Sequence, residues 1–344
     1  MESKTTYYFG QAQTDIYFQA DKSLLSTLNP GQNIILVTDE NIHAAYADFF
    51  ASYKSVIIKA GEINKQQAAV DSIISQLLEM GADKSTYLIG VGGGVVTDIT
   101  GFAASIYKRG MKLALMPTSI LAMVDAALGG KNGVDAGLYK NMIGTIYQPG
   151  FILFDYDFLK TLPRTEWING FAEIIKHAAI KDAGMFSFLE ENDLETFMQE
   201  PQKISGLIEK NARLKLDVVT RDEKEIGERK MLNFGHTLGH AIENLHHLPH
   251  GHAISIGMVA AAQLSEKILG YPAEETARLI RLLKKYHLPV ECNINVPQVF
   301  KLLAADKKVT ANQVDFILLK KTGQAEVHSL PLQSLENYLN EMYS

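Results

Sequence analysis

Hydrophobic and polar positions follow two different patterns along the chain. In the first half, short apolar runs end at polar or glycine residues and are followed by segments with helical spacing. The apolar runs at 33–37, 55–58, 87–91 and 112–116 predict strands, and residues 68–80 and 94–107 predict helices. Strands that alternate with helices indicate a largely parallel sheet covered by helices.

The second half carries almost no strand signal. Five segments have helical spacing and one short β pattern returns near the end: 167–181, 201–213, 233–244, 253–268 and 273–285 as helices, and 314–319 as a strand. The chain therefore predicts a Rossmann-like α/β nucleotide-binding domain over residues 1–160. A mainly α-helical domain, which would bind metal and substrate, is predicted over residues 161–344.

Composition and charge narrow the class of protein. Hydrophobic residues make up 47% of the chain and charged residues 21%, as in ordinary globular proteins. The net charge of −6 argues against nucleic-acid or membrane partners, but a local group of Lys and Arg can still hold a small anion. The N-terminus lacks the apolar core of a signal peptide, and the single Cys292 cannot form an internal disulfide. We therefore expect a cytoplasmic protein.

The glycine turn Gly90-Val91-Gly92-Gly93-Gly94 lies between a predicted strand and a predicted helix. Glycines at this place let the backbone approach a pyrophosphate at the helix N-terminus. The turn departs from the usual fingerprint because Val95 stands where a third glycine is common. The expected ribose-binding carboxylate is also missing, so Asp39 or Glu62 would have to take its role. A tight turn without a ligand would give the same pattern, although Asp98 one turn into the helix favours a ligand.

A histidine cluster follows in the second half, where six of the ten histidines fall between positions 236 and 252. His236 and His240 are four residues apart, which places them on one face of a helix. Catalytic zinc usually takes three protein ligands, and Glu173 is a candidate for the carboxylate among them. For any one histidine a hydrogen-bonded core or surface position is the alternative, and spacing alone does not say which histidines bind.

Several basic residues have surroundings suited to phosphate. Lys131 and Lys140 are flanked by glycines in a setting that predicts loops. Further candidates are Arg109, Lys215, Arg229, Lys307 and Lys308. An exposed charge on a solvated face is the alternative for each of them.

Taken together, these segments resemble the 3-dehydroquinate synthase family from about residue 33 to about residue 325. The strongest stretches are 92–98, 101–110, 117–119, 124–125 with 129–131, 140–144 with 148–149, 232–243, 250–251 and 306–308, with Glu173 and Lys176 between them. Each stretch is modest evidence, but their order and spacing are highly specific.

The resemblance implies a dehydroquinate synthase-like fold and an NAD- and metal-dependent carbon–oxygen lyase of the shikimate pathway. Its substrate would be 3-deoxy-D-arabino-heptulosonate 7-phosphate, and its products 3-dehydroquinate and phosphate. In this scheme NAD takes a hydride from the substrate, phosphate leaves by β-elimination, the hydride is returned, and an intramolecular aldol reaction closes the ring.

The resemblance also implies roles for particular residues. It implies Glu173, His236 and His250 as ligands of zinc or cobalt. It implies NAD contacts from Asp39, Asn41, Glu62, Lys65, Gly93, Gly94, Val95, Asp98, Thr118, Ser119, Lys131, Lys140, Thr161 and Leu162. Substrate binding and catalysis would fall to Asp125, Lys131, Lys140, Asn141, Lys176, Lys215, Arg229, Asn233, His240 and either Lys307 or Lys308. Arg109 would reach a phosphate site across a dimer interface, so a homodimer is expected.

Some positions depart from the family pattern. His252 stands where the family commonly has Glu, which leaves the third metal ligand open between His250 and His252. Three other functions remain open: another sugar phosphate cyclase, a metal-dependent polyol or alcohol dehydrogenase, and a non-catalytic regulator. Lys140-Asn141 favours the dehydroquinate reaction. A dehydrogenase would consume NAD and would not need so many lysines, and a regulator is expected to have lost metal ligands.

Overall fold

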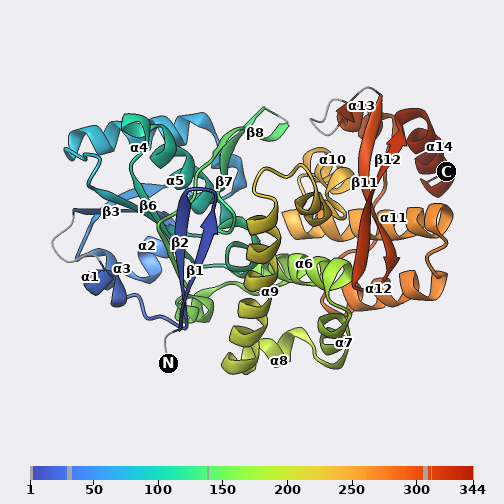
Figure 1. Cartoon of the computed structure of the whole chain (residues 1–344), viewed down its shortest axis with the longest axis horizontal. Helices are drawn as coiled ribbons and strands as arrows, with labels where there is room; N and C mark the ends of the chain where they lie inside the picture. Colours follow the sequence, from blue (N-terminus) through green and yellow to red (C-terminus); the bar gives the residue numbers. More distant parts are fainter. Residues whose placement is uncertain (1–2, 29–32, 138, 305–308, 311, 344) are drawn as a thin grey trace. The chain divides into compact units, whose positions relative to one another are not determined.

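The computed structural model describes residues 3–28, 33–137, 139–304, 309–310 and 312–343 (Figure 1). The chain forms two compact units, Met1–Glu166 with Pro201–Lys224, and Trp167–Glu200 with Glu225–Ser344. Helix α9 (Pro201–Arg221) thus belongs to the first unit, although a boundary at residue 160 assigns it to the second domain. Arg213 of this helix contacts the first two strands of the first unit. Its guanidinium lies over the Phe18 ring and donates a hydrogen bond to Thr5 Oγ1.

The first unit contains a seven-stranded sheet in the order β1-β2-β9-β6-β5-β3-β4. Its strands are β1 (Ser3–Phe9), β2 (Ala12–Phe18), β3 (Ile34–Asp39), β4 (Lys54–Ile58), β5 (Tyr87–Gly92), β6 (Lys112–Pro117) and β9 (Phe151–Leu153). All neighbouring pairs are parallel except β1 with β2. The α/β fold class predicted from the sequence is confirmed.

Besides α9, the described helices of the first unit connect its strands. They are α1 (Leu24–Leu28), α2 (Glu40–Ala45), α3 (Ala47–Phe50), α4 (Gln67–Glu79) and α5 (Gly94–Ile106). Strand β4 follows β3 toward one edge of the sheet, whereas β6 follows β5 toward the other. The strand order therefore reverses between β3 and β5. In sheets of this kind ligands bind beyond the carboxyl ends of the strands at such a point.

An antiparallel hairpin of β7 (Lys131–Ala136) and β8 (Tyr139–Ile146) also belongs to this unit. The loop-like setting predicted for Lys131 and Lys140 is therefore wrong, because both lie on strands. The loop prediction was based on the glycines that flank these two lysines, and these glycines have another role. Gly133 pairs with Gly144, and a Cβ on either would lie within 2.5 Å of a backbone oxygen of the facing strand. These glycines allow close approach of two strands rather than a turn.

The second unit is mainly helical, as predicted. Its helices are α6 (Arg164–Lys181, which starts at the boundary), α7 (Ala183–Glu191), α8 (Leu194–Gln199), α10 (His236–His246), α11 (His250–Leu269), α12 (Ala273–Lys285), α13 (Val296–Ala304) and α14 (Leu332–Tyr343). A small antiparallel sheet of β10 (Val309–Thr310), β11 (Gln313–Lys321) and β12 (Gln324–Pro331) packs with them. The sequence predicted only the centre of β11, since β12 buries few of its side chains.

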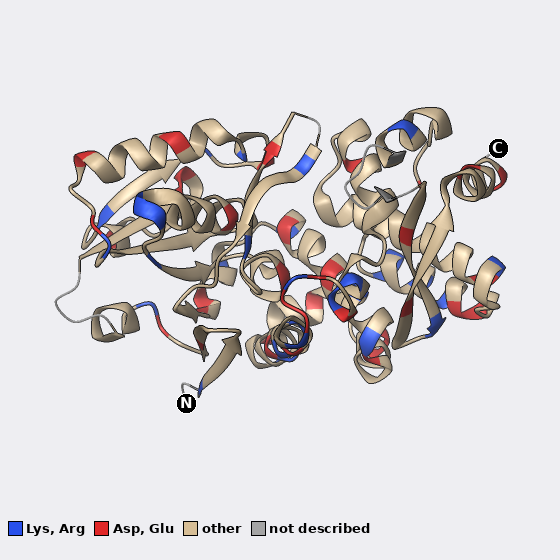
Figure 2. Cartoon of the chain, turned by 45° about the horizontal axis from the view of Figure 1, so that its top comes forward, with Lys and Arg blue, Asp and Glu red and all other residues tan. Residues whose placement is uncertain are grey.

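Charge is mixed over the chain, with acidic and basic residues interspersed on the elements of both units (Figure 2). The formal net charge of the whole chain is −6. No helix among the described residues is long and apolar enough to cross a bilayer.

Candidate active site

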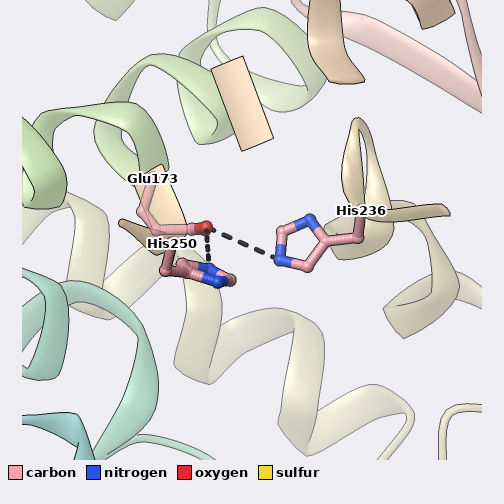
Figure 3. Close-up of side chains that lie close together, drawn as sticks. All are labelled: Glu173, His236 and His250. Atoms are coloured by element: carbon pink, nitrogen blue, oxygen red, sulfur yellow. Dashed lines mark hydrogen bonds and ion pairs between the residues drawn. The ribbon is translucent and has the colours of Figure 1, made fainter. Parts of the chain in front are cut away.

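A Glu–His–His cluster lies in the second unit. Glu173 comes from the middle of α6, and His236 and His250 are the first residues of α10 and α11 (Figure 3). Glu173 Oε1 lies 3.3 Å from His250 Nε2 and 3.6 Å from His236 Nε2. Two ligand atoms on a tetrahedral zinc, each about 2.0–2.1 Å from it, lie about 3.3–3.4 Å apart. The spacing of the three side chains therefore fits one divalent metal.

Close packing of α10 on α11 brings the two histidines together. Gly235 precedes His236 with a φ of 78°, in the left-handed region that favours glycine. A Cβ on Gly235 would lie 2.7 Å from Met258 Cγ, and a Cβ on Gly257 would lie 2.0 Å from Gly235 O. Side chains at these positions would push the helices apart and separate the metal ligands.

The second ring nitrogen of each histidine also has a partner. His236 Nδ1 lies 3.2 Å from Phe234 O, and His250 Nδ1 lies 3.1 Å from Glu243 Oε2. With a proton on Nδ1, each ring donates to that oxygen and leaves the Nε2 lone pair toward Glu173. Histidines that bind metals are usually held in this way. The donor set therefore fits a metal in its chemistry as well as its spacing.

Opposing influences act on His250. Burial lowers the pKa of its imidazole, but the carboxylates of Glu173 and Glu243 raise it more, and the net result is a pKa of about 10. Without a metal the site therefore favours an imidazolium that balances the nearby carboxylates. A divalent cation can replace this proton as the positive charge.

Two further predicted residues adjoin the cluster. Lys176 lies one turn after Glu173 on α6, is 1% exposed, and forms an ion pair with Glu173 Oε2. The His240 ring centroid lies 5.2 Å from that of His236 and 6.1 Å from that of His250. Among the described residues, the group that includes Glu173 and His236 contains His250 and not His252. This geometry favours His250 as the third ligand.

The glycine turn of the first unit lies where the sheet order reverses. Gly93 precedes α5, and an added Cβ there would lie 3.4 Å from Ser119 Oγ, so the glycine turn lies beside Ser119. Thr118 and Ser119 follow the end of β6. Asp39 ends β3, and its Oδ1 accepts hydrogen bonds from the N–H groups of Asn41 and Ile42. Its carboxylate therefore caps α2 at the carboxyl edge of the sheet.

Five predicted residues form a charged network in the same unit. Lys65 Nζ donates to Asp98 Oδ2 and, at 2.7 Å, to Asn141 Oδ1. Lys140 Nζ donates to Glu62 Oε1 at 2.9 Å. Burial lowers the pKa of Lys65, but Asp98 and Glu62 raise it more, so Lys65 stays charged. The resemblance assigns Glu62, Lys65, Asp98 and Lys140 to one NAD site, but no spacing in the sequence indicates their contacts with one another.

The remaining predicted residues are placed as follows. Lys215 Nζ donates to Asp125 Oδ1 at 2.6 Å. Asn233 donates to Glu225, Arg229 is buried, and Thr161 Oγ1 lies 2.9 Å from Tyr46 OH. Lys131 and Arg109 are exposed, and Gly94, Val95 and Leu162 are partly buried. Lys307 and Lys308 lie outside the described residues.

Glu243 and Asp135 contact several site residues and were not assigned a role from the sequence. Glu243 lies seven residues after His236, about two helical turns, and this spacing could have indicated it. Asp135 contacts both Lys140 and Asn141, but its place depends on how the hairpin folds and no spacing in the sequence indicates it.

A doubly wound sheet with a glycine turn and a Glu–His–His cluster together define a metal-dependent enzyme of the nucleotide-binding α/β class. The model for the N-terminal part of 3-dehydroquinate synthase matches residues 55–169, and that for its C-terminal part matches residues 170–309. The chain belongs to the 3-dehydroquinate synthase family, which confirms the resemblance seen in the sequence.

Individual relatives agree with this assignment. A 3-dehydroquinate synthase from Picosynechococcus sp. is 36% identical and covers 94% of each chain. One from Dichelobacter nodosus is 40% identical over 86% of this chain and 83% of its own. The solved structure of a 2-epi-5-epi-valiolone synthase from Streptomyces hygroscopicus, with NAD+ and Zn2+ bound, is 25% identical with a TM-score of 0.88. It covers 97% of this chain and 98% of that chain.

Proposed function

We propose that this enzyme converts 3-deoxy-D-arabino-heptulosonate 7-phosphate to 3-dehydroquinate and phosphate. The observation that carries the proposal is identity of 36–40% to 3-dehydroquinate synthases over most of the chain, together with an intact Glu–His–His cluster. The cofactors are NAD and a divalent metal, zinc or cobalt. Retained metal ligands also argue against a non-catalytic regulator.

In the second unit, Glu173, His236 and His250 would hold the metal. When bound, the metal would supply Lewis-acid stabilisation of negative charge on a substrate oxygen. Lys176 is buried beside Glu173, so its ammonium can stabilise developing negative charge in a place of low dielectric. His240 is partly exposed next to the ligand histidines and can move a proton between substrate and solvent. Arg229 and Asn233 from the preceding 3-10 helix (Glu228–Asn233) would bind substrate.

In the first unit, residues at the carboxyl ends of the strands would bind NAD, which would accept and return one hydride in each turnover. The set is Asp39, Asn41, Glu62, Lys65, Gly93, Gly94, Val95, Asp98, Thr118, Ser119, Thr161 and Leu162, with Lys131 and Lys140. Lys131, Lys140, Asn141, Asp125 and Lys215 would bind the substrate, and the lysines among them suit its phosphate. Holding the reacting groups in place would supply much of the rate.

We also propose a cytoplasmic homodimer. Apolar side chains are 40–47% exposed at the end of α5 and on β8, namely Ile106, Tyr139, Met142, Ile143 and Ile146. Thr145 Oγ1 lies 2.8 Å from Ser105 Oγ and joins these two elements. An exposed apolar surface of this kind is typical of an interaction site. Arg109 ends the 3-10 helix Tyr107–Arg109 that follows α5, so dimer formation through this surface would agree with its predicted role.

The proposed function is tested by counting phosphate released per NAD. Purified enzyme with metal, the heptulosonate phosphate and substoichiometric NAD should release many phosphates per NAD without accumulating NADH. Product identity then separates dehydroquinate from the carbocycles of other sugar phosphate cyclases. Steady NADH formation from simple polyols, with no phosphate release, would instead establish a dehydrogenase.

Glu243→Gln is expected to weaken metal binding about 10- to 100-fold, as is usual when a carboxylate that orients a ligand histidine is lost. The amide can still meet the His250 ring but no longer offers a negative charge. Competition with a fluorescent chelator measures the affinity directly. Glu266→Gln on α11, which is far along the same helix from His250, is the control. Unchanged metal affinity in the Glu243 variant would show that His250 needs no such support.

A further inference from the structure

We propose that Asp135 is a positioning residue that fixes Lys140 and Asn141 against the segment Glu62–Lys65. This inference rests on the proposed function, which assigns NAD or substrate binding to Glu62, Lys65, Lys140 and Asn141. Asp135 lies on β7 and itself has no assigned contact with either ligand. Its role would be to hold in place the side chains that contact substrate and NAD.

Three contacts of Asp135 carry the proposal. Its Oδ1 accepts a hydrogen bond from the Asn141 N–H at 2.8 Å, and its Oδ2 lies 3.3 Å from Lys140 Nζ. Its own N–H donates to Lys65 O at 2.9 Å. One residue thus joins two consecutive residues of β8 to the backbone of the segment that carries Glu62 and Lys65.

An irregularity in the hairpin makes these contacts available. The register of β7 and β8 shifts between Val134 and Ala136, so Asp135 is left out of the regular pairing. Such irregularities re-aim a side chain and free backbone groups from the ladder. Here the freed N–H reaches Lys65, and Gln66 forms an isolated parallel bridge with Asp135.

Asn141 depends on this support for its conformation. Its φ is 52°, in the left-handed region that non-glycine residues adopt infrequently. The bond from its N–H to Asp135 holds the backbone there, and its side-chain oxygen then accepts from Lys65 Nζ. Without the carboxylate, Asn141 is expected to relax toward a common conformation and its side chain to leave Lys65.

Lys140 is held between two carboxylates of different exposure. The Glu62 side chain is 45% exposed, whereas that of Asp135 is 12% exposed. A mobile, solvated partner orders a lysine poorly, because holding two long side chains together costs entropy. The shorter and better buried Asp135 is therefore the partner that limits where the Lys140 ammonium lies.

Steady-state kinetics of Asp135→Ala and Asp135→Asn test this role. Loss of positioned binding groups should raise the KM for the heptulosonate phosphate about tenfold or more in Asp135→Ala, with kcat within about threefold of wild type. Asp135→Asn keeps an oxygen for the Asn141 N–H but loses the charge opposite Lys140, so it should raise KM by a smaller factor. Metal content, which depends on the second unit, should not change.

A purely structural role gives a different result, since a smaller folded fraction lowers the apparent kcat and leaves KM unchanged. Asp83→Asn is the matched control, because Asp83 also accepts backbone N–H bonds, from Ser85 and Thr86, away from the site. If wild-type enzyme releases phosphate but Asp135→Asn shows wild-type KM, the positioning role is refuted even if Asp135→Ala does not fold. If wild-type enzyme releases no phosphate, the proposed function has failed instead.

Discussion

Replacing His236 with alanine is expected to remove the metal and the phosphate-releasing activity together. Only three side chains form the Glu–His–His cluster, and a catalytic metal usually needs all three. Losing a direct ligand should cost more than the roughly 100-fold drop typical when a supporting residue is lost. Metal per chain by elemental analysis and phosphate release, measured on the same sample, check the result.

His246→Ala is the matched control for this experiment. His246 ends the same helix α10, is exposed, and is not part of the Glu–His–His cluster. It should keep full metal content and rate. A His236→Ala enzyme that keeps wild-type metal content would refute the ligand assignment. Full activity with less than about 0.1 metal per chain would instead show that the reaction needs no metal at this site.

The metal cluster shows what sequence can predict about such a site. His236 and His240 lie four residues apart in a regular helix, so their shared face follows from helical geometry alone. The choice between His250 and His252 could not be made in that way. It depends on the direction in which α11 leaves the turn after α10, and this is set by the packing of Gly235 against Gly257.

The charged network of the first unit marks where prediction from sequence stops. Lys65, Asp98 and Asn141 were each predicted to bind ligands, but their mutual contacts join elements 33 and 76 residues apart. The contact of Lys65 with Asn141 depends on the β7–β8 hairpin, whose paired glycines indicate loops rather than strands. Asp135 could not be found because its function arises from an irregularity in that hairpin.

Lys176→Met is expected to lower kcat about 100- to 10,000-fold, the usual range for a group that assists proton transfer or charge development. Methionine keeps most of the apolar bulk of the buried side chain while removing its ammonium. NAD binding should remain, because its predicted residues all belong to the first unit. Measurements of kcat and of NAD affinity by fluorescence titration separate the two effects.

The ion pair between Lys176 and Glu173 requires a further measurement, since Glu173 is also a predicted metal ligand. Removing the ammonium leaves a buried carboxylate that can bind the metal at least as well, so metal content should not fall. Lys181→Met is the control, because Lys181 lies on the same helix and pairs with Glu228 at a partly exposed position. Ion pairs at exposed positions contribute about 0.2–1 kcal/mol to folding stability. Losing this pair should therefore leave the enzyme folded and its kcat unchanged. An unchanged kcat in Lys176→Met with full metal would remove Lys176 from the mechanism and leave His240 as the remaining residue proposed to transfer a proton.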